Sequence, residues 1–183
     1  MSKILSVLLL SLPLIAGTCH YEAKKTDVEW KAYKTPLKLG VGGTFDLVTT
    51  DAKQKHSAKE YFSTAEVSIK TASINSKNDS RDAKLVKSFF QVQGVKEIKA
   101  KVISLDKKVL TVAITINNIT KNIPMKLDLD DNELEAEGYI DLADFKMLPS
   151  LKSINQACYD LHQGKTWQDV KIEIELELKK VCN

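Results

Sequence analysis

Cysteine and histidine are the residue types in this chain that could most readily form a nucleophile or bind a metal, and there are three of each. Cys158 and His162 stand four residues apart, which would place them on one face of a helix and let the imidazole activate the thiol against a lipid headgroup. A disulfide or an inert thiol explains Cys158 more simply. None of the three histidines has the spacing of a metal ligand relative to another histidine, a cysteine or a carboxylate, so the sequence predicts no metal site.

Carboxylates and glycines offer weaker candidates for chemistry. The acidic residues around 128–135 surround one expected hairpin, and their order does not match a calcium-binding EF-hand loop, so a solvated turn explains them better. Gly40, Gly42 and Gly43 suggest a phosphate-binding loop, but they end in Thr44 and Phe45 with no lysine-bearing helix start behind them. We interpret these glycines as bends in a strand. The sequence therefore predicts no catalytic residue, no enzyme activity and no cofactor.

The N-terminal segment has the order of a secretory signal peptide. Lys3 precedes an apolar run from Ile4 to Ile15, and the small residues 16–18 follow it. The run is shorter than the roughly 20 residues of a membrane-spanning helix, and no later segment is apolar enough to span. We expect residues 1–18 to be removed on export to the periplasm and residues 19–183 to form one domain. Lipid anchoring at Cys19 is the less favoured alternative, because residues 16–18 match a lipoprotein signal poorly.

Composition indicates a globular protein without an affinity for polyanions. The chain is 43% hydrophobic and 28% charged, and its net charge of +3 comes from interspersed residues of both signs. Such a balance does not predict binding to nucleic acid or to an anionic membrane. A homodimer is left open.

Apolar and polar residues alternate from Val28 onward. The clearest case is 170–179, where valine, isoleucine and leucine alternate with lysine and glutamate. A helix would mix these apolar and charged faces, whereas an antiparallel strand would bury one and expose the other. The pattern predicts eight strands, at 26–34, 40–50, 60–72, 96–105, 108–118, 121–130, 133–142 and 168–180. Two long connections are expected to contain short helices, near 82–89 and 150–162.

Eight such strands either close into a barrel or divide into a sandwich. Short polar turns between the later strands favour an all-β, antiparallel up-and-down barrel, whose interior could hold one small ligand. In that barrel the first and last strands are neighbours, so Cys19 and Cys182 lie at one end and Cys158 at the other. We predict a Cys19–Cys182 disulfide that stabilises the protein by roughly 2–4 kcal/mol. Pairing of Cys158 with either of the others is the alternative.

The apolar faces of the strands point towards a common interior, which is either a packed core or a cavity for a lipid-like ligand. In a cavity, each buried methylene of a ligand would contribute about 0.8 kcal/mol. The residues expected to face inwards are Trp30, Phe45, Val67, Ile69, Ile98, Val102, Ile114, Ile116, Met125, Leu127, Ile140, Ile172 and Ile174.

Three short motifs in the sequence are the most specific: Ala-Ser-Ile-Asn-Ser at 72–76, Arg-Asp-Ala-Lys-Leu at 81–85 and Ser-Phe-Phe-Gln-Val at 88–92. They resemble motifs of the YceI-like family of periplasmic lipid- or polyisoprenoid-binding proteins. The stretches 41–45 and 110–124 also agree with the family pattern. The resemblance implies an eight-stranded, lipocalin-like barrel with a helical segment near its mouth, which holds an isoprenoid or fatty amphiphile in an apolar bore.

The helical motif adds three candidate ligand-binding residues. Asp82 suits the first turn of a helix, and Arg81 either pairs with a carboxylate or meets a ligand headgroup. Phe89 and Phe90 either belong to the core or line the mouth of the barrel. The hypothesis from the sequence is a non-enzymatic periplasmic carrier. Its main rival is a structural or stress-response protein with a filled barrel that acts through protein–protein contacts.

Overall fold

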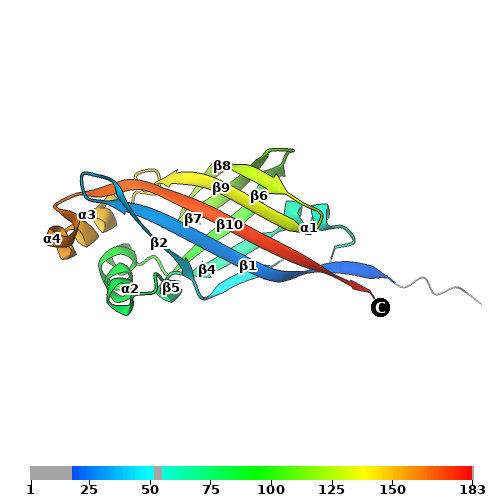
Figure 1. Cartoon of the computed structure of the whole chain (residues 1–183), viewed down its shortest axis with the longest axis horizontal. Helices are drawn as coiled ribbons and strands as arrows, with labels where there is room; N and C mark the ends of the chain where they lie inside the picture. Colours follow the sequence, from blue (N-terminus) through cyan, green and yellow to red (C-terminus); the bar gives the residue numbers. More distant parts are fainter. Residues whose placement is uncertain (1–17, 52–54, 183) are drawn as a thin grey trace, which may run out of the picture.

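The computed structural model describes residues 18–51 and 55–182, and its main feature is a curled antiparallel sheet (Figure 1). Within these residues the sheet has ten strands in the order β3-β4-β6-β7-β8-β9-β10-β1-β2-β5. The strands are β1 (Cys19–Lys34), β2 (Leu39–Phe45), β3 (Val48–Asp51), β4 (Glu66–Lys70), β5 (Ile74–Asn75), β6 (Glu97–Leu105), β7 (Val109–Ile116), β8 (Ile119–Leu129), β9 (Glu133–Asp141) and β10 (Thr166–Cys182). The expected all-β, lipocalin-like architecture is confirmed in the form of a half-barrel, whereas the number of strands differs from the predicted eight.

Four α-helices lie at the two ends of the curled sheet in the described part of the chain. They are α1 (Ala58–Thr64), α2 (Asp79–Leu85), α3 (Leu148–Ala157) and α4 (Tyr159–His162), and a π-helical turn (Val86–Phe90) follows α2. Helix α1 covers one end, and α2, α3 and α4 gather at the other (Figure 1). The helical segments expected near 82–89 and 150–162 are therefore confirmed. No helix in the described residues combines the length and the apolar character needed to cross a bilayer.

The first and last strands lie side by side and are the longest in the sheet. They pair antiparallel along most of their length, and Cys19 stands directly opposite Cys182. The two cysteines form a disulfide with their Cα atoms 4.1 Å apart, which confirms the predicted pairing. Cys158 is free and buried at the opposite end, beside the helices. The predicted signal peptide, residues 1–18, lies outside the described residues apart from Thr18.

The predicted strand at 40–50 is two strands, because the chain changes partners at Asp46 and Leu47. Strand β2 pairs with β1, whereas β3 pairs with β4. Both residues at the bend donate their backbone N–H to Ser73, Asp46 to its carbonyl oxygen and Leu47 to its hydroxyl. The Asn75 side chain also donates to the Asp46 carboxylate at 2.8 Å. These contacts satisfy the backbone where the ladder is interrupted.

The predicted strand at 60–72 is wrong in its first half, where α1 forms instead. Ser57 caps this helix by accepting a hydrogen bond from the Glu60 backbone N–H at 3.2 Å, in a Ser-x-x-Glu arrangement typical of helix starts. Tyr61 and Phe62 are buried against the sheet. Only Glu66–Lys70 pairs as a strand. The alternation that indicated a strand is therefore confined to the residues after the helix.

At the α1 end the inward face of the sheet is covered by a packed core. Phe62, Leu110 and Met125 are each exposed by 1% or less of their surface. Towards α2, α3 and α4 some inward-facing residues, such as Ile172 and Ile174, are only partly buried. This difference in packing along the barrel positions the candidate site.

Candidate functional site

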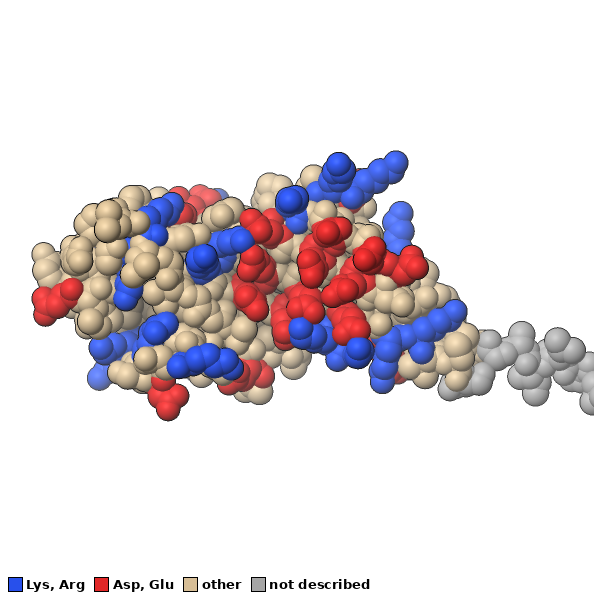
Figure 2. Space-filling model, in the orientation of Figure 1, with Lys and Arg blue, Asp and Glu red and all other residues tan. Residues whose placement is uncertain are grey.

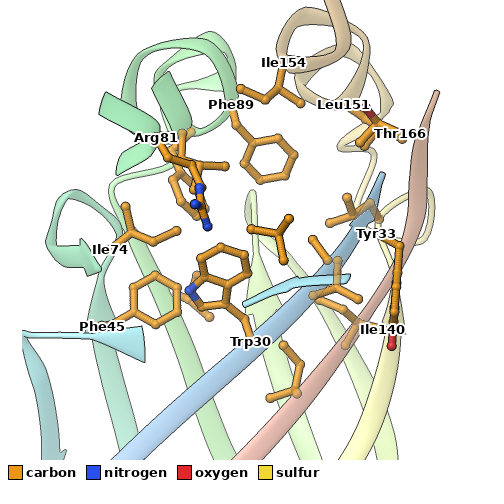
Figure 3. Close-up of a pocket in the computed structure, with 18 of the residues that line it drawn as sticks. Trp30, Tyr33, Phe45, Ile74, Arg81, Phe89, Ile140, Leu151, Ile154 and Thr166 are labelled. Atoms are coloured by element: carbon orange, nitrogen blue, oxygen red, sulfur yellow. The ribbon is translucent and has the colours of Figure 1, made fainter. Parts of the chain in front are cut away.

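A cavity of about 430 Å³ lies inside the sheet at the end where α2, α3 and α4 gather (Figure 3). Its walls come from the inward faces of β1, β2, β4, β6, β7, β9 and β10, and α2 and α3 cover it with Leu85, Leu151 and Ile154. The volume and the predominance of apolar side chains are those of a small-molecule pocket. The sequence alone left a filled core and a cavity open, and the structure has a cavity.

Most residues that the sequence placed in the barrel interior or mouth line this cavity. They are Trp30, Phe45, Val67, Ile69, Arg81, Phe89, Phe90, Ile98, Ile114, Ile116, Ile140, Ile172 and Ile174. Three others, Val102, Met125 and Leu127, face inwards but do not line it. They pack in the core nearer α1, where the backbone N–H of Val102 donates to the Ala65 carbonyl next to that helix. A contact between any of these residues and a ligand stays a prediction.

Inward-facing residues of β10 show where the cavity begins. Leu176 and Leu178 are 4% and 3% exposed in the packed half of the barrel. Ile172 and Ile174 point to the same side of the strand, yet they are only partly buried. They keep accessible surface because they face the cavity. The same apolar face of one strand thus serves as core at one end and as pocket wall at the other.

Trp30 is held in the cavity wall by a close approach of backbone. Its indole N–H donates to the Thr44 carbonyl at 3.3 Å. A Cβ atom on Gly43 would lie 2.9 Å from the Trp30 ring and 2.4 Å from the Asn75 carbonyl oxygen, so only glycine fits here. Phe45 lies beside Trp30 in the same wall (Figure 3). Gly43, one of the three clustered glycines, therefore leaves the space in which the tryptophan sits.

Polar residues gather where the cavity opens between the helices. Lys34, Arg81, Lys84 and His162 are among its lining residues. The His162 ring is hydrogen-bonded through Nδ1 to the Thr166 hydroxyl at 2.8 Å. Burial, and secondarily the positive charges of Lys34 and Lys84, lower the pKa of His162 below its ordinary value.

The side chains of Cys158 and His162 have separate surroundings in the structure. In the described residues no hydrogen bond joins the two side chains, and the Nδ1 atom of His162 is taken by Thr166. Cys158 is buried and lines the cavity. Residues 18–51 and 55–182 also contain no group of three His, Cys, Asp or Glu side chains placed to hold a metal.

Sequence reasoning missed several cavity residues that left a signal. Leu151, Ile154 and Cys158 repeat at the three- and four-residue spacing of an apolar helix stripe, and all three line the cavity. Ala32 continues the inward alternation of Trp30 on β1 and lines it as well. Lys34 and Lys84 carried no such signal, because a lysine near a strand or helix end is ordinarily a solvated residue.

Comparison with known proteins identifies the family. The chain matches the model of the YceI-like domain over residues 20–178. No match is found among curated proteins. Among solved structures, it is similar to a polyisoprenoid binding domain from Saccharophagus degradans implicated in plant cell wall breakdown, with 13% identity and a TM-score of 0.61 over 89% of this chain and 98% of that one.

Two further solved structures share the fold. BcnA from Burkholderia cenocepacia is 13% identical, with a TM-score of 0.57 over 84% of this chain and 96% of that one. A YCEI protein from Campylobacter jejuni is 21% identical, with a TM-score of 0.52 over 78% of this chain and 85% of that one. The family match extends over nearly all the described residues and agrees with the curled sheet and its cavity. The chain therefore belongs to the YceI-like domain family, which has a binding-protein fold.

Proposed function

We propose that this protein is a periplasmic, non-enzymatic carrier that holds a long-chain isoprenoid or another lipid-like amphiphile in its barrel interior. The observation that carries the proposal is the apolar cavity of about 430 Å³, whose walls include inward-facing side chains, such as Ile172 and Ile174, that are only partly buried. The family match and a similar fold in a polyisoprenoid binding domain support it. The Cys19–Cys182 disulfide supports an oxidising compartment.

The cavity sets the size of the apolar tail. If each small group takes about 30 Å³, the volume of a water molecule in the liquid, 430 Å³ accommodates about 14 groups. Each buried methylene contributes about 0.8 kcal/mol, so two more methylenes tighten binding by roughly tenfold. Once the tail fills the cavity, further groups extend into solvent and contribute little. Affinity is therefore expected to rise with chain length and then level off.

A chain-length series tests the proposal. Isoprenoid and linear alcohols of increasing length compete with a fluorescent fatty probe for the purified, oxidised protein. The proposal predicts a rise in affinity by roughly tenfold per two methylenes, with a plateau near 14 groups. Failure of every length to displace the probe, or an affinity independent of length, would show that the interior does not bind a tail.

A further inference from the structure

The described residues that line the cavity include three permanent cations and no carboxylate. The cations are Lys34 at the end of β1 and Arg81 and Lys84 on α2. All Asp and Glu residues of the chain lie within the described ranges, so every acidic side chain is accounted for. The side chains that line the opening of the cavity between the helices, which we call the mouth, therefore carry an excess of positive charge.

Arg81 extends from α2 into the cavity. Figure 3 shows its guanidinium pointing inwards beside Ile74 and towards Trp30. The side chain is partly buried. Its backbone is fixed, because the Asn78 side chain caps α2 by accepting from the Arg81 backbone N–H at 2.9 Å. The helix therefore presents a planar, five-donor group to the interior.

No carboxylate lies within ion-pair distance of the Arg81 guanidinium in residues 18–51 and 55–182. The nearest acidic neighbour in sequence, Asp82, instead accepts hydrogen bonds from the Ser76 backbone N–H at 3.0 Å and the Ser76 hydroxyl at 2.5 Å. Some lysines elsewhere in the protein do have acidic partners: Lys25 contacts Glu175 at 2.8 Å and Lys171 contacts Glu137 at 2.9 Å. A partly buried guanidinium without an acidic partner has lost some of its hydrogen bonds to water. An anion bound at the mouth would replace them with charge-assisted hydrogen bonds.

Asp79 and Asp82 on α2 and Asp160 on α4 belong to the helices at the mouth but do not line the cavity. Many of the other carboxylates lie on the outer face of the sheet. On the outer face of the sheet, Glu135 stands opposite Glu175 and Glu137 opposite Glu173. Figure 2 shows a cluster of acidic side chains midway along this face, with basic side chains on both sides of it. At the mouth itself, the charges of Lys34 and Lys84 contribute to the lowered pKa of His162, as expected where positive groups surround one opening.

From this arrangement we propose that the mouth binds an anionic oxygen headgroup, a phosphate or a carboxylate, with Arg81 as the main contact and Lys34 and Lys84 as supporting charges. The ligand class is thus an amphiphile with an apolar tail and an anionic head. This inference rests on the proposed function, since it assigns the tail to the cavity. The guanidinium can hold such a headgroup through two parallel hydrogen bonds, which a lysine cannot reproduce.

The inference is tested by titrating four compounds into the full mature protein: farnesol, farnesyl monophosphate, farnesoic acid and inorganic phosphate. We expect the monophosphate and the acid to bind at least about tenfold more tightly than the alcohol, since charge-assisted hydrogen bonds of this kind account for such a factor. Inorganic phosphate alone should bind far more weakly than the monophosphate, because it lacks the tail.

Arg81→Gln should remove most of the preference for the anions over farnesol, and Arg81→Lys should restore part of that preference. Lys87→Gln is the matched control, because Lys87 follows α2, is exposed and is not among the lining residues. Equal affinities of wild type for alcohol and anions, or equal losses for both in Arg81→Gln, overturn the headgroup assignment and leave the carrier function standing. Inorganic phosphate that binds as tightly as the monophosphate overturns the assignment to an amphiphile. If neither alcohol nor anions bind, both proposals fail.

Discussion

The same substitution should have opposite effects in the two halves of the barrel. Ala32 lines the cavity on β1, whereas Ala65 lies beside α1 and is only 3% exposed in the packed end. Leucine adds three carbons to alanine. At position 32 these carbons enter the cavity, where burial contributes up to about 2.4 kcal/mol, less roughly 0.5–1 kcal/mol for lost side-chain freedom. We therefore expect Ala32→Leu to raise the free energy of unfolding by about 1–2 kcal/mol.

At position 65 no such space exists, so the three carbons must displace their neighbours. Overpacking of this kind costs about 1–3 kcal/mol. Equilibrium unfolding in urea, with the disulfide intact and the slope unchanged among variants, gives the comparison. Ala32→Leu should also weaken binding of a long-chain alcohol. The reasoning about the cavity is refuted if Ala32→Leu destabilises the protein as much as Ala65→Leu does.

Three other predictions follow from particular contacts. Replacing Cys19 and Cys182 by serine should lower the free energy of unfolding by about 2–5 kcal/mol in urea, because the disulfide closes a long loop in the unfolded chain; a loss near zero would contradict this. Gly43→Ala should destabilise the protein and weaken ligand binding, because the added Cβ would meet the backbone of β5. Gly40→Ala should change stability little, because its Cβ would meet only the flexible end of a lysine. Thermal unfolding and probe displacement distinguish the two variants. The lowered pKa of His162 means that the folded state favours the neutral ring, so stability is fully kept above about pH 6.5 and falls as the pH drops from there through the lowered folded pKa. Urea unfolding over a series of pH values should show a smaller fall in the free energy of unfolding for His162→Gln than for the wild type. A variant with the same pH profile as the wild type would contradict this prediction.

The direction of side chains along the strands could be predicted from the sequence, whereas the depth of the cavity could not. Alternation correctly turns both Met125 and Ile174 inwards. It cannot say that Met125 lies in the packed half and Ile174 at the cavity, because that depends on which helices cover each end of the barrel. Burial by distant elements leaves no mark on the local pattern of a strand.

Two local features show the same difference between what the sequence can and cannot predict. The start of α1 carried a readable signal, because Ser57 and Glu60 stand at the spacing of a helix cap. The break between β2 and β3 did not, since it depends on hydrogen bonds from Asp46 and Leu47 to Ser73, far along the chain. The start of α1 was therefore predictable from local residues, although the strand predicted at 60–72 overlooked it, whereas a strand that changes its partner left no local signal.

The central claim is that the barrel interior carries a lipid-like amphiphile. Native mass spectrometry of the mature protein purified from its own host, before and after organic extraction, tests it most directly. The account predicts a discrete lipid adduct that extraction removes and that an added long-chain isoprenoid restores. A bare protein mass before extraction, with no uptake of added isoprenoids or fatty amphiphiles, would contradict it.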